Sequence, residues 1–245
     1  MENNKAEIYY LFHSGFAVKL KNRLLIFDYY MDENKNGKKG LDGGTISEED
    51  IKSADSVFVF VSHSHFDHFN PIVFDWQKAN DNIHYFLSYE VKTPATSPRY
   101  HNLYPHEEYD NGDIKVKAYG STDLGVSFLV DIDGLRIFHA GDLNCWFWYN
   151  GSTVQQLGAA KDMFLNELDQ IEGVDIDIAF FPVDPRLEDY FFLGGEYFIK
   201  RFYPKLFVPM HFGRRTDITD SFAEMFKELP IRIARLSHRG QKITY

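Results

Sequence analysis

Short apolar runs separated by polar turns dominate the first third of the chain. The runs lie at residues 8–12, 16–20 and 24–27, and their close spacing predicts a meander of antiparallel strands. Residues 32–50 are polar and hold several glycines, so we expect a loop there.

The rest of the chain alternates strand-like and helix-like stretches. Apolar runs predict further strands at residues 57–61, 114–119, 126–130, 135–138, 177–181, 206–210 and 231–236. Apolar residues at helical spacing, and Pro71 in a first-turn position, predict helices at residues 71–79, 154–171, 195–202 and 222–229. A turn is expected at residues 131–134. Hairpins in both halves, with helices between them, fit two sheets packed face to face with helices outside. We see no linker, and therefore predict one domain, residues 1–245, with two similar halves of about 1–120 and 121–245.

Composition is that of a globular protein with a sizeable core. The chain has 245 residues, of which 44% are hydrophobic and 17% aromatic. No apolar run approaches the roughly 20 residues that span a bilayer, and the first five residues lack the layout of a signal peptide. The single cysteine, Cys145, can form no internal disulfide, which fits a reducing compartment. We expect a soluble, cytoplasmic protein.

The formal net charge of −10 bears on possible partners. Proteins that bind nucleic acid usually carry a basic stripe that neutralises phosphates. The basic clusters here are short, at Lys38-Lys39, Arg214-Arg215 and residues 235–239. Nucleic acid is therefore disfavoured as a partner, and a small-molecule substrate is favoured. The sequence leaves the oligomeric state open.

The segment His63-Ser64-His65-Phe66-Asp67-His68 is the strongest chemical signal, and it follows the apolar run 57–61 directly. A strand that ends in a tight loop can point such side chains at one place. Imidazole and carboxylate groups are ligands that suit zinc and neighbouring metals. Four potential ligands within six residues therefore predict a metal site.

Two other strand ends carry candidate ligands. Asp142 follows the strand at 135–138, and His211 follows the strand at 206–210. Strand-end loops often present functional groups, although a lone histidine or aspartate there more often makes a capping hydrogen bond. Structural or surface roles are expected for the scattered histidines His13, His84, His101, His106 and His238. His139 is expected to point toward the core.

Taken together, these motifs resemble the metallo-β-lactamase superfamily. The histidine cluster at 63–68 resembles that family's signature. Further similarity lies in the segments 13–16, 24–28, 139–142 and 209–211. These resemble the branch that includes L-ascorbate-6-phosphate lactonase. The resemblance implies a four-layer αββα sandwich of two mixed sheets flanked by helices, an α/β (α+β) fold, with the active site at one edge of the sheets.

The resemblance also implies a ligand set. His63 and His65 would bind a first divalent metal ion, while Asp67, His68 and His211 would bind a second. Asp142 would bridge the two ions. The ions would be zinc, with manganese and iron left open because every ligand is nitrogen or oxygen.

One ligand expected from the resemblance is missing. The family has a third histidine for the first metal on the loop before the strand at 126–130, where this chain has Ser121-Thr122-Asp123. Asp123 can replace the imidazole, since carboxylates bind zinc and manganese. Alternatively the first site is weak or empty, and residues 121–123 form a hydrogen-bonded turn.

Substrate-binding residues are less clear from the sequence. Trp146 and Trp148 follow Asp142 closely and can wall a pocket, or they can be buried under a loop. Arg186 follows another strand end and can clamp a carboxylate or phosphate, or form a surface ion pair. Cys145 is expected to be inert.

These residues predict a metal-dependent hydrolase that acts on a small-molecule ester, lactone or phosphoester. A metal-bound water would be the nucleophile, because a bound dication lowers the pKa of water from about 15.7 to about 7. By analogy with the family, Asp67 would orient this water and accept its proton. Two alternatives remain at this stage: a phosphodiesterase or nuclease, and a non-catalytic binding protein with a degenerate metal site.

Overall fold

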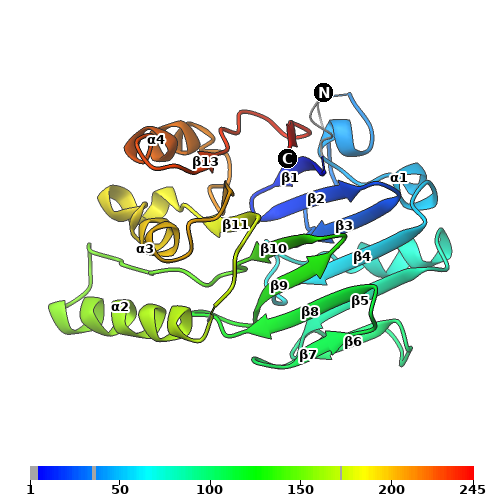
Figure 1. Ribbon diagram of the computed structural model, residues 1–245, viewed down its shortest axis with the longest axis horizontal. Helices are drawn as coiled ribbons and strands as arrows, with labels where there is room; N and C mark the ends of the chain where they lie inside the picture. The colour runs from blue at the N-terminus through cyan, green and yellow to red at the C-terminus, as the bar shows by residue number, and fades with distance from the viewer. Residues whose placement is uncertain (1–4, 35–36, 172) are drawn as a thin grey trace. The chain divides into compact units, whose positions relative to one another are not determined.

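The computed structural model describes residues 5–34, 37–171 and 173–245, which form two compact units. The first unit contains the chain up to Leu103 together with Ser237–Tyr245, and the second contains Tyr104–Leu236. Each unit is built on one seven-stranded sheet (Figure 1). The sequence predicts one domain, residues 1–245, with two similar halves that meet near residue 120, and this stays a prediction.

The sheet of the first unit has the order β14-β1-β2-β3-β4-β5-β6. Its strands are β1 (Glu7–Phe12), β2 (Gly15–Leu20), β3 (Arg23–Phe27), β4 (Ser56–Val61), β5 (Ile83–Ser88), β6 (Tyr100–Leu103) and β14 (Lys242–Thr244). The first three form the predicted antiparallel meander. From β3 to β6 neighbouring strands pair in parallel. The carboxyl ends of β3 and β4 therefore meet at one edge of the sheet.

Both faces of β4 are buried, as its continuous apolar run predicts. Val57, Val59 and Val61 belong to a core cluster that also contains Ile51 of α1 (Glu48–Lys52) and Trp76 of the 3-10 helix η2 (Pro71–Lys78). Phe60 points to the other face of β4. Its ring stacks on the rings of Phe27 in β3 and Phe86 in β5. This packing holds the end of β4 firmly in place.

Arg239 ties the end of the chain into the first unit. Its guanidinium group donates to the main-chain carbonyls of Leu11, Met31, Glu33 and Gly44. A planar fork with five donors can bridge several carbonyls at once, which a lysine ammonium cannot do in the same geometry. The contacts fix the loop after β3 against the strand that leads to residue 13.

The sheet of the second unit has the order β13-β12-β11-β10-β9-β8-β7. Its strands are β7 (Glu108–Asp110), β8 (Ile114–Tyr119), β9 (Ser127–Ile132), β10 (Leu135–His139), β11 (Ile178–Pro182), β12 (Leu206–Met210) and β13 (Arg232–Ile233). The predicted turn joins β9 to β10 through Asp133 and Gly134, whose φ angles of 50° and 74° suit a two-residue type I′ hairpin. From β10 to β13 the strands run parallel, so the carboxyl ends of β10, β11 and β12 share an edge.

Among its described residues, the second unit has the α-helices α2 (Val154–Asp169), α3 (Leu193–Phe202) and α4 (Asp217–Met225). They pack on the sheet through phenylalanines. Phe198 of α3 contacts Phe138 and Phe181, and Phe222 of α4 stacks on Phe207. Within the described residues, no helix has both the length and the apolar character needed to cross a membrane.

Several expectations from the sequence need correction. The predicted loop at 32–50 contains the 3-10 helix η1 (Leu41–Gly43) and the start of α1, which begins with a capping box between Ser47 and Asp50. With five residues and one buried apolar side chain, α1 gives almost no periodic signal. The helix predicted at 71–79 is a 3-10 helix. The helix predicted at 222–229 lies earlier, at Asp217–Met225, and the strand predicted at 231–236 shortens to β13. Strands β5, β6, β7 and β14 were not predicted.

We expect acid to destabilise the protein partly through His101. Burial first, and then the charge of His84, lower the pKa of His101 to about 4. An unfolded histidine has a pKa of about 6.5. The unfolded chain therefore binds more protons between about pH 4 and 6.5, and the free energy of unfolding should rise with pH across that window. Urea unfolding of His101→Asn should show a weaker pH dependence. The exposed His238→Asn is the control, and an unchanged slope in His101→Asn would contradict this assignment.

Candidate metal centre

The loop after β4 brings the clustered histidines together, as the sequence predicts. The backbone N–H groups of His68 and Phe69 donate to the carbonyl of His65 at 3.0 and 3.1 Å, so the chain turns back sharply. The turn buries His63 and His68 and leaves His65 exposed. One ligand atom of His63 and one of His68 lie within 4.8 Å of each other. The ring of His65 meets that of His63 edge-on, with 4.5 Å between their centroids.

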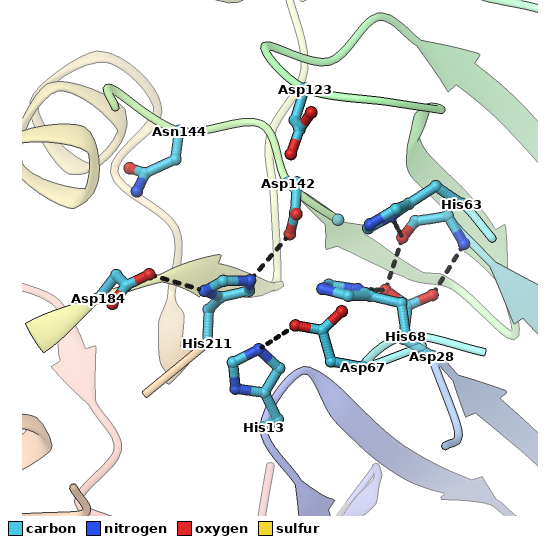
Figure 2. A network of polar contacts seen from close by, with 12 residues as sticks. His13, Asp28, His63, Asp67, His68, Asp123, Asp142, Asn144, Asp184 and His211 are labelled. Carbon is cyan, nitrogen blue, oxygen red and sulfur yellow. Dashed lines mark hydrogen bonds and ion pairs between the residues drawn. The ribbon is translucent and has the colours of Figure 1, made fainter. Parts of the chain in front are cut away.

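Asp28, at the end of β3, organises this loop (Figure 2). Its carboxylate accepts hydrogen bonds from the Ser62 backbone N–H at 2.8 Å, the Ser62 hydroxyl at 2.6 Å and His68 Nδ1 at 2.7 Å. Asp28 is 1% exposed and has a φ of 42°, in the left-handed region that aspartate and asparagine tolerate best among non-glycine residues. The parallel pairing of β3 with β4 places the carboxylate beside Ser62.

These hydrogen bonds determine which imidazole nitrogens can bind a metal. His68 Nδ1 must carry a proton to donate to Asp28, so in the neutral imidazole the lone pair is on Nε2. The Ser62 hydroxyl has one hydrogen, which it gives to Asp28, and it must therefore accept from His63 Nδ1 at 3.0 Å. The lone pair of His63 is then on Nε2 as well. A carboxylate that orients a histidine in this way is typical of metal ligands.

His13, for which the sequence predicts a structural or surface role, lies in the same site. It is 8% exposed, and its Nε2 is 3.6 Å from Asp67 Oδ2. His13, Asp67 and His68 each offer one ligand atom within 4.8 Å of the other two. The φ of His13 is 56°, a rare value that turns the side chain at the tight connection between β1 and β2. His13 is thus a further candidate ligand, or a proton-transfer partner of Asp67.

In the second unit, His211 lies between two carboxylates (Figure 2). Its Nδ1 is 3.0 Å from Asp184 Oδ2, and its Nε2 is 3.1 Å from Asp142 Oδ1. All three side chains are at least nine-tenths buried. If Nδ1 donates to Asp184, the lone pair on Nε2 faces a carboxylate oxygen, which is repulsive unless a cation joins them. Either a second proton on His211 or a metal ion fulfils that need, so these residues fit a metal site.

Asp184 is held as an anion by its neighbours. Burial alone would raise its pKa, but hydrogen bonds from His211 and then from Arg186 lower the pKa of Asp184 to about 2. Arg186 donates from Nε at 3.0 and 2.9 Å to the two carboxylate oxygens, and also from Nη2. The sequence leaves two roles open for Arg186, an anion clamp for the substrate and an ion pair within the protein surface. In the structure its fork binds Asp184, so its visible role is to position Asp184 and, through it, His211.

Asp123 lies beside Asp142. One oxygen of each carboxylate lies within 4.8 Å of the other. The two loops are joined by Thr122, whose hydroxyl donates to the carbonyl of Asn144 at 2.6 Å and accepts from its backbone N–H at 2.9 Å. The Asp123 backbone N–H also donates to the Ser121 hydroxyl at 3.3 Å, as in the predicted turn. Turn formation and metal ligation by Asp123 are therefore compatible.

We expect Asp123→Ala to weaken one metal site while leaving the fold unchanged. Asp123 is exposed and its loop is held through Thr122, so its removal should cost under about 0.5 kcal/mol of stability. Bound metal, measured by elemental analysis after dialysis, should fall by up to one equivalent. Asp162→Ala, an exposed change on α2, is the matched control. Unchanged metal content in Asp123→Ala would show that Asp123 is no ligand.

Each unit therefore brings its own predicted residues together. His63, His65, Asp67 and His68 share one loop of the first unit, and Asp123, Asp142 and His211 share an edge of the second. Three residues of these clusters were missed or assigned another role: His13, Asp28 and Asp184. All three lie at or just after the end of an apolar strand. Many residues that only cap a strand lie there too, so this position does not by itself indicate a metal site.

His139 is buried as expected, and its Nδ1 accepts a hydrogen bond from the backbone N–H of Gly141. Cys145 is buried, which raises its thiol pKa to about 11 and agrees with an inert role.

Comparison with known proteins reveals similarity over nearly the whole chain. Residues 7–211 match the model of the beta-lactamase superfamily domain. A UPF0173 metal-dependent hydrolase of Alkaliphilus metalliredigens is 23% identical over 244 residues, which is 91% of this chain and 92% of that protein.

Two solved structures are similar in fold. A metallo hydrolase from the archaeon Ignicoccus hospitalis is 14% identical and aligns over 98% of both chains with a TM-score of 0.62. A metallo-β-lactamase fold protein from Bacillus subtilis is 11% identical and aligns over 99% of this chain and 100% of its own with a TM-score of 0.59. At these identities the likeness establishes the fold alone. The two mixed seven-stranded sheets with their helices are therefore those of the predicted fold.

Proposed function

The chain belongs to the beta-lactamase superfamily, and on that premise we propose that it is a metal-dependent hydrolase. The proposed ligands are His63, His65, Asp67 and His68 from the first unit, with Asp142, His211 and Asp123 from the second. Together they would hold one or two divalent ions. Zinc is the first choice for this set of imidazole and carboxylate donors, and manganese and iron are the alternatives.

One observation carries the proposal more than any other. The hydrogen bonds of Asp28 and Ser62 involve Nδ1 of both His63 and His68, which leaves Nε2 of each neutral imidazole with the lone pair. Buried histidines in a purely structural role need no such common orientation. A metal-binding pair does need it, because both ligand atoms must be deprotonated and must point at the ion.

The reaction that fits this site is hydrolysis by an activated water. A bound dication would supply hydroxide near neutral pH. Asp67 is partly exposed, so its carboxylate can meet solvent, accept a proton from the attacking water and keep the water oriented. His13 Nε2, at 3.6 Å from Asp67 Oδ2, can take part in moving that proton away.

The proposed substrate is a small-molecule ester, lactone or phosphoester. The net charge of −10 disfavours nucleic acid, and the resemblance to the L-ascorbate-6-phosphate lactonase branch favours a lactone or phosphorylated ester. One observation supports a second candidate. The first metal lacks its third histidine, which would suit a protein that binds a single metal or a ligand without turnover.

Metal removal tests the proposal. Purified protein should retain metal after dialysis and hydrolyse at least one member of a panel of lactones, phosphate monoesters and phosphodiesters. Chelation should abolish this hydrolysis, and zinc or manganese should restore it, because the water is not activated without the ion. Hydrolysis that persists after complete metal removal would contradict the proposal. Stoichiometric metal without hydrolysis of any panel member would favour the second candidate.

A further inference from the structure

The aromatic segment after Asp142 has an unusual backbone. The N–H groups of Phe147, Trp148 and Tyr149 each donate to the carbonyl two residues earlier, at 2.7, 3.0 and 2.8 Å. Consecutive bonds of this γ-turn kind make side chains alternate between two sides. Phe147 and Tyr149 both pack on Tyr190, with centroids 4.8 and 5.1 Å away.

Trp146 and Trp148, which alternate with Phe147 and Tyr149 along the segment, carry two parallel indole rings. The rings of Trp146 and Trp148 are tilted by only 5° relative to each other, with centroids 6.0 Å apart. Trp146 is fixed, because its indole N–H donates to the carbonyl of Asp142 at 3.1 Å. Its ring also meets the ring of His211 edge-on at 5.4 Å. The pair thus begins directly beside two of the proposed metal ligands.

Trp148 extends this surface toward solvent. It is 41% exposed, and the guanidinium carbon of Arg186 lies 5.6 Å from its ring centroid. Arg186 is itself held by Asp184, so the ring of Trp148 lies against a group that is fixed by hydrogen bonds. At the end of the aromatic segment, the side chain of Asn150 donates a hydrogen bond to the Glu188 carboxylate. The φ of Glu188 is 54°, a value that is rare for a residue other than glycine. Both flanks of the segment are therefore held in position.

We propose that Trp146 and Trp148 form a stacking platform for a planar ring of the substrate, placed next to the group that is hydrolysed. This inference rests on the proposed function, because it takes His211 and Asp142 as the reacting end of the site. Parallel aromatic faces stack on flat unsaturated rings, whereas a puckered ring touches them with fewer atoms. The substrate class is therefore an ester, lactone or phosphoester that carries an aromatic or heteroaromatic ring.

An anion clamp at this position fits the structure less well. The Nε and Nη2 donors of Arg186 already bind Asp184, which leaves the aromatic faces as the larger recognition surface. A positive charge near Trp148 also favours stacking of electron-rich rings beside it.

The test compares two ligands that differ in flatness. Benzoate and cyclohexanecarboxylate share a carboxylate and a six-membered ring, but only benzoate is planar. Their dissociation constants would be measured by titration of tryptophan fluorescence and by saturation-transfer NMR, with and without chelator. Benzoate should bind about two- to tenfold more tightly, the range that one aromatic contact provides. Because cyclohexane is the more hydrophobic ring, simple apolar contact would give the opposite order.

Variants of Trp148 assign the preference to the platform. In Trp148→Leu the affinity ratio should fall to about one, while Trp148→Phe should keep part of it. Tyr104→Leu, a change at another exposed aromatic residue of the second unit, should leave the ratio unchanged. Circular dichroism and sedimentation of each variant would show that fold and oligomeric state are preserved.

The outcomes separate this inference from the proposed function. An equal or reversed preference in the wild-type protein, or a preference that survives in Trp148→Leu, would overturn the platform. Loss of self-association in Trp148→Leu, without any ring preference in the wild type, would also overturn it and identify a contact between copies. A ring preference that Trp148→Leu removes, in a protein without bound metal or hydrolysis, would support the platform and contradict only the proposed function.

Discussion

Asp142→Ala is expected to strip bound metal from the protein and to abolish hydrolysis. The carboxylate lies 3.1 Å from His211 Nε2 and within 4.8 Å of the Asp123 carboxylate, so it is placed to serve both groups of donors in its unit. Loss of a residue that only orients a ligand costs about 10–100-fold in metal affinity or activity. Loss of the proposed bridging ligand should therefore exceed 100-fold. Elemental analysis and a hydrolysis assay on the same sample measure both effects.

The controls for Asp142→Ala separate metal loss from unfolding. The fold should survive, because the backbone of this loop is held through Thr122 and through the hydrogen bond from Ala140 N–H to the carbonyl of Phe180. Circular dichroism should therefore resemble that of the wild type. Asp162→Ala, on the exposed side of α2, should keep full metal content. Stoichiometric metal in Asp142→Ala would rule out the bridging role.

Asp28→Asn is expected to have the second-largest effect, although Asp28 need not touch the metal. The substitution keeps the size of the side chain and tolerates the φ of 42°. It replaces an acceptor oxygen by an NH₂ group, so at least one of the three donors that now face the carboxylate would lose its acceptor. We expect a loss of about 1–3 kcal/mol in the free energy of unfolding and of about 10–100-fold in metal affinity.

Ser62→Ala is the matched control for Asp28→Asn. It removes the link from Asp28 to His63 but leaves the bond from His68 to Asp28 intact. Its effect on metal affinity should therefore be smaller than that of Asp28→Asn. Competition with a zinc indicator would measure both affinities, and urea unfolding of the metal-free proteins would measure stability. Wild-type metal affinity in Asp28→Asn would contradict the orienting role.

Local patterns predicted much of the fold. The meander of β1 to β3 and the fully buried strand β4 follow from short apolar runs and turns. The helix α2 follows from its helical spacing, and its end lies within two residues of the predicted one. Apart from β5, which has six mostly buried residues, the elements that were missed have weaker local signals. α1 has one buried apolar residue, and β6, β7 and β14 have three or four residues each, with mixed burial. Their structure depends on neighbouring strands rather than on their own sequence.

The candidate site divides in the same way. By itself the sequence determined the ligand-rich loop at 63–68, because six consecutive residues at the end of a buried strand must lie close together. It also favoured the proposed kind of chemistry, since imidazoles and carboxylates without cysteine suit metal-activated water. Tertiary structure alone decided the partners of those ligands. Asp28 reaches His68 only because β3 pairs in parallel with β4, and Asp184 reaches His211 only because β11 pairs with β12. Such contacts depend on strand order and register, which a linear pattern of apolar and polar residues does not contain.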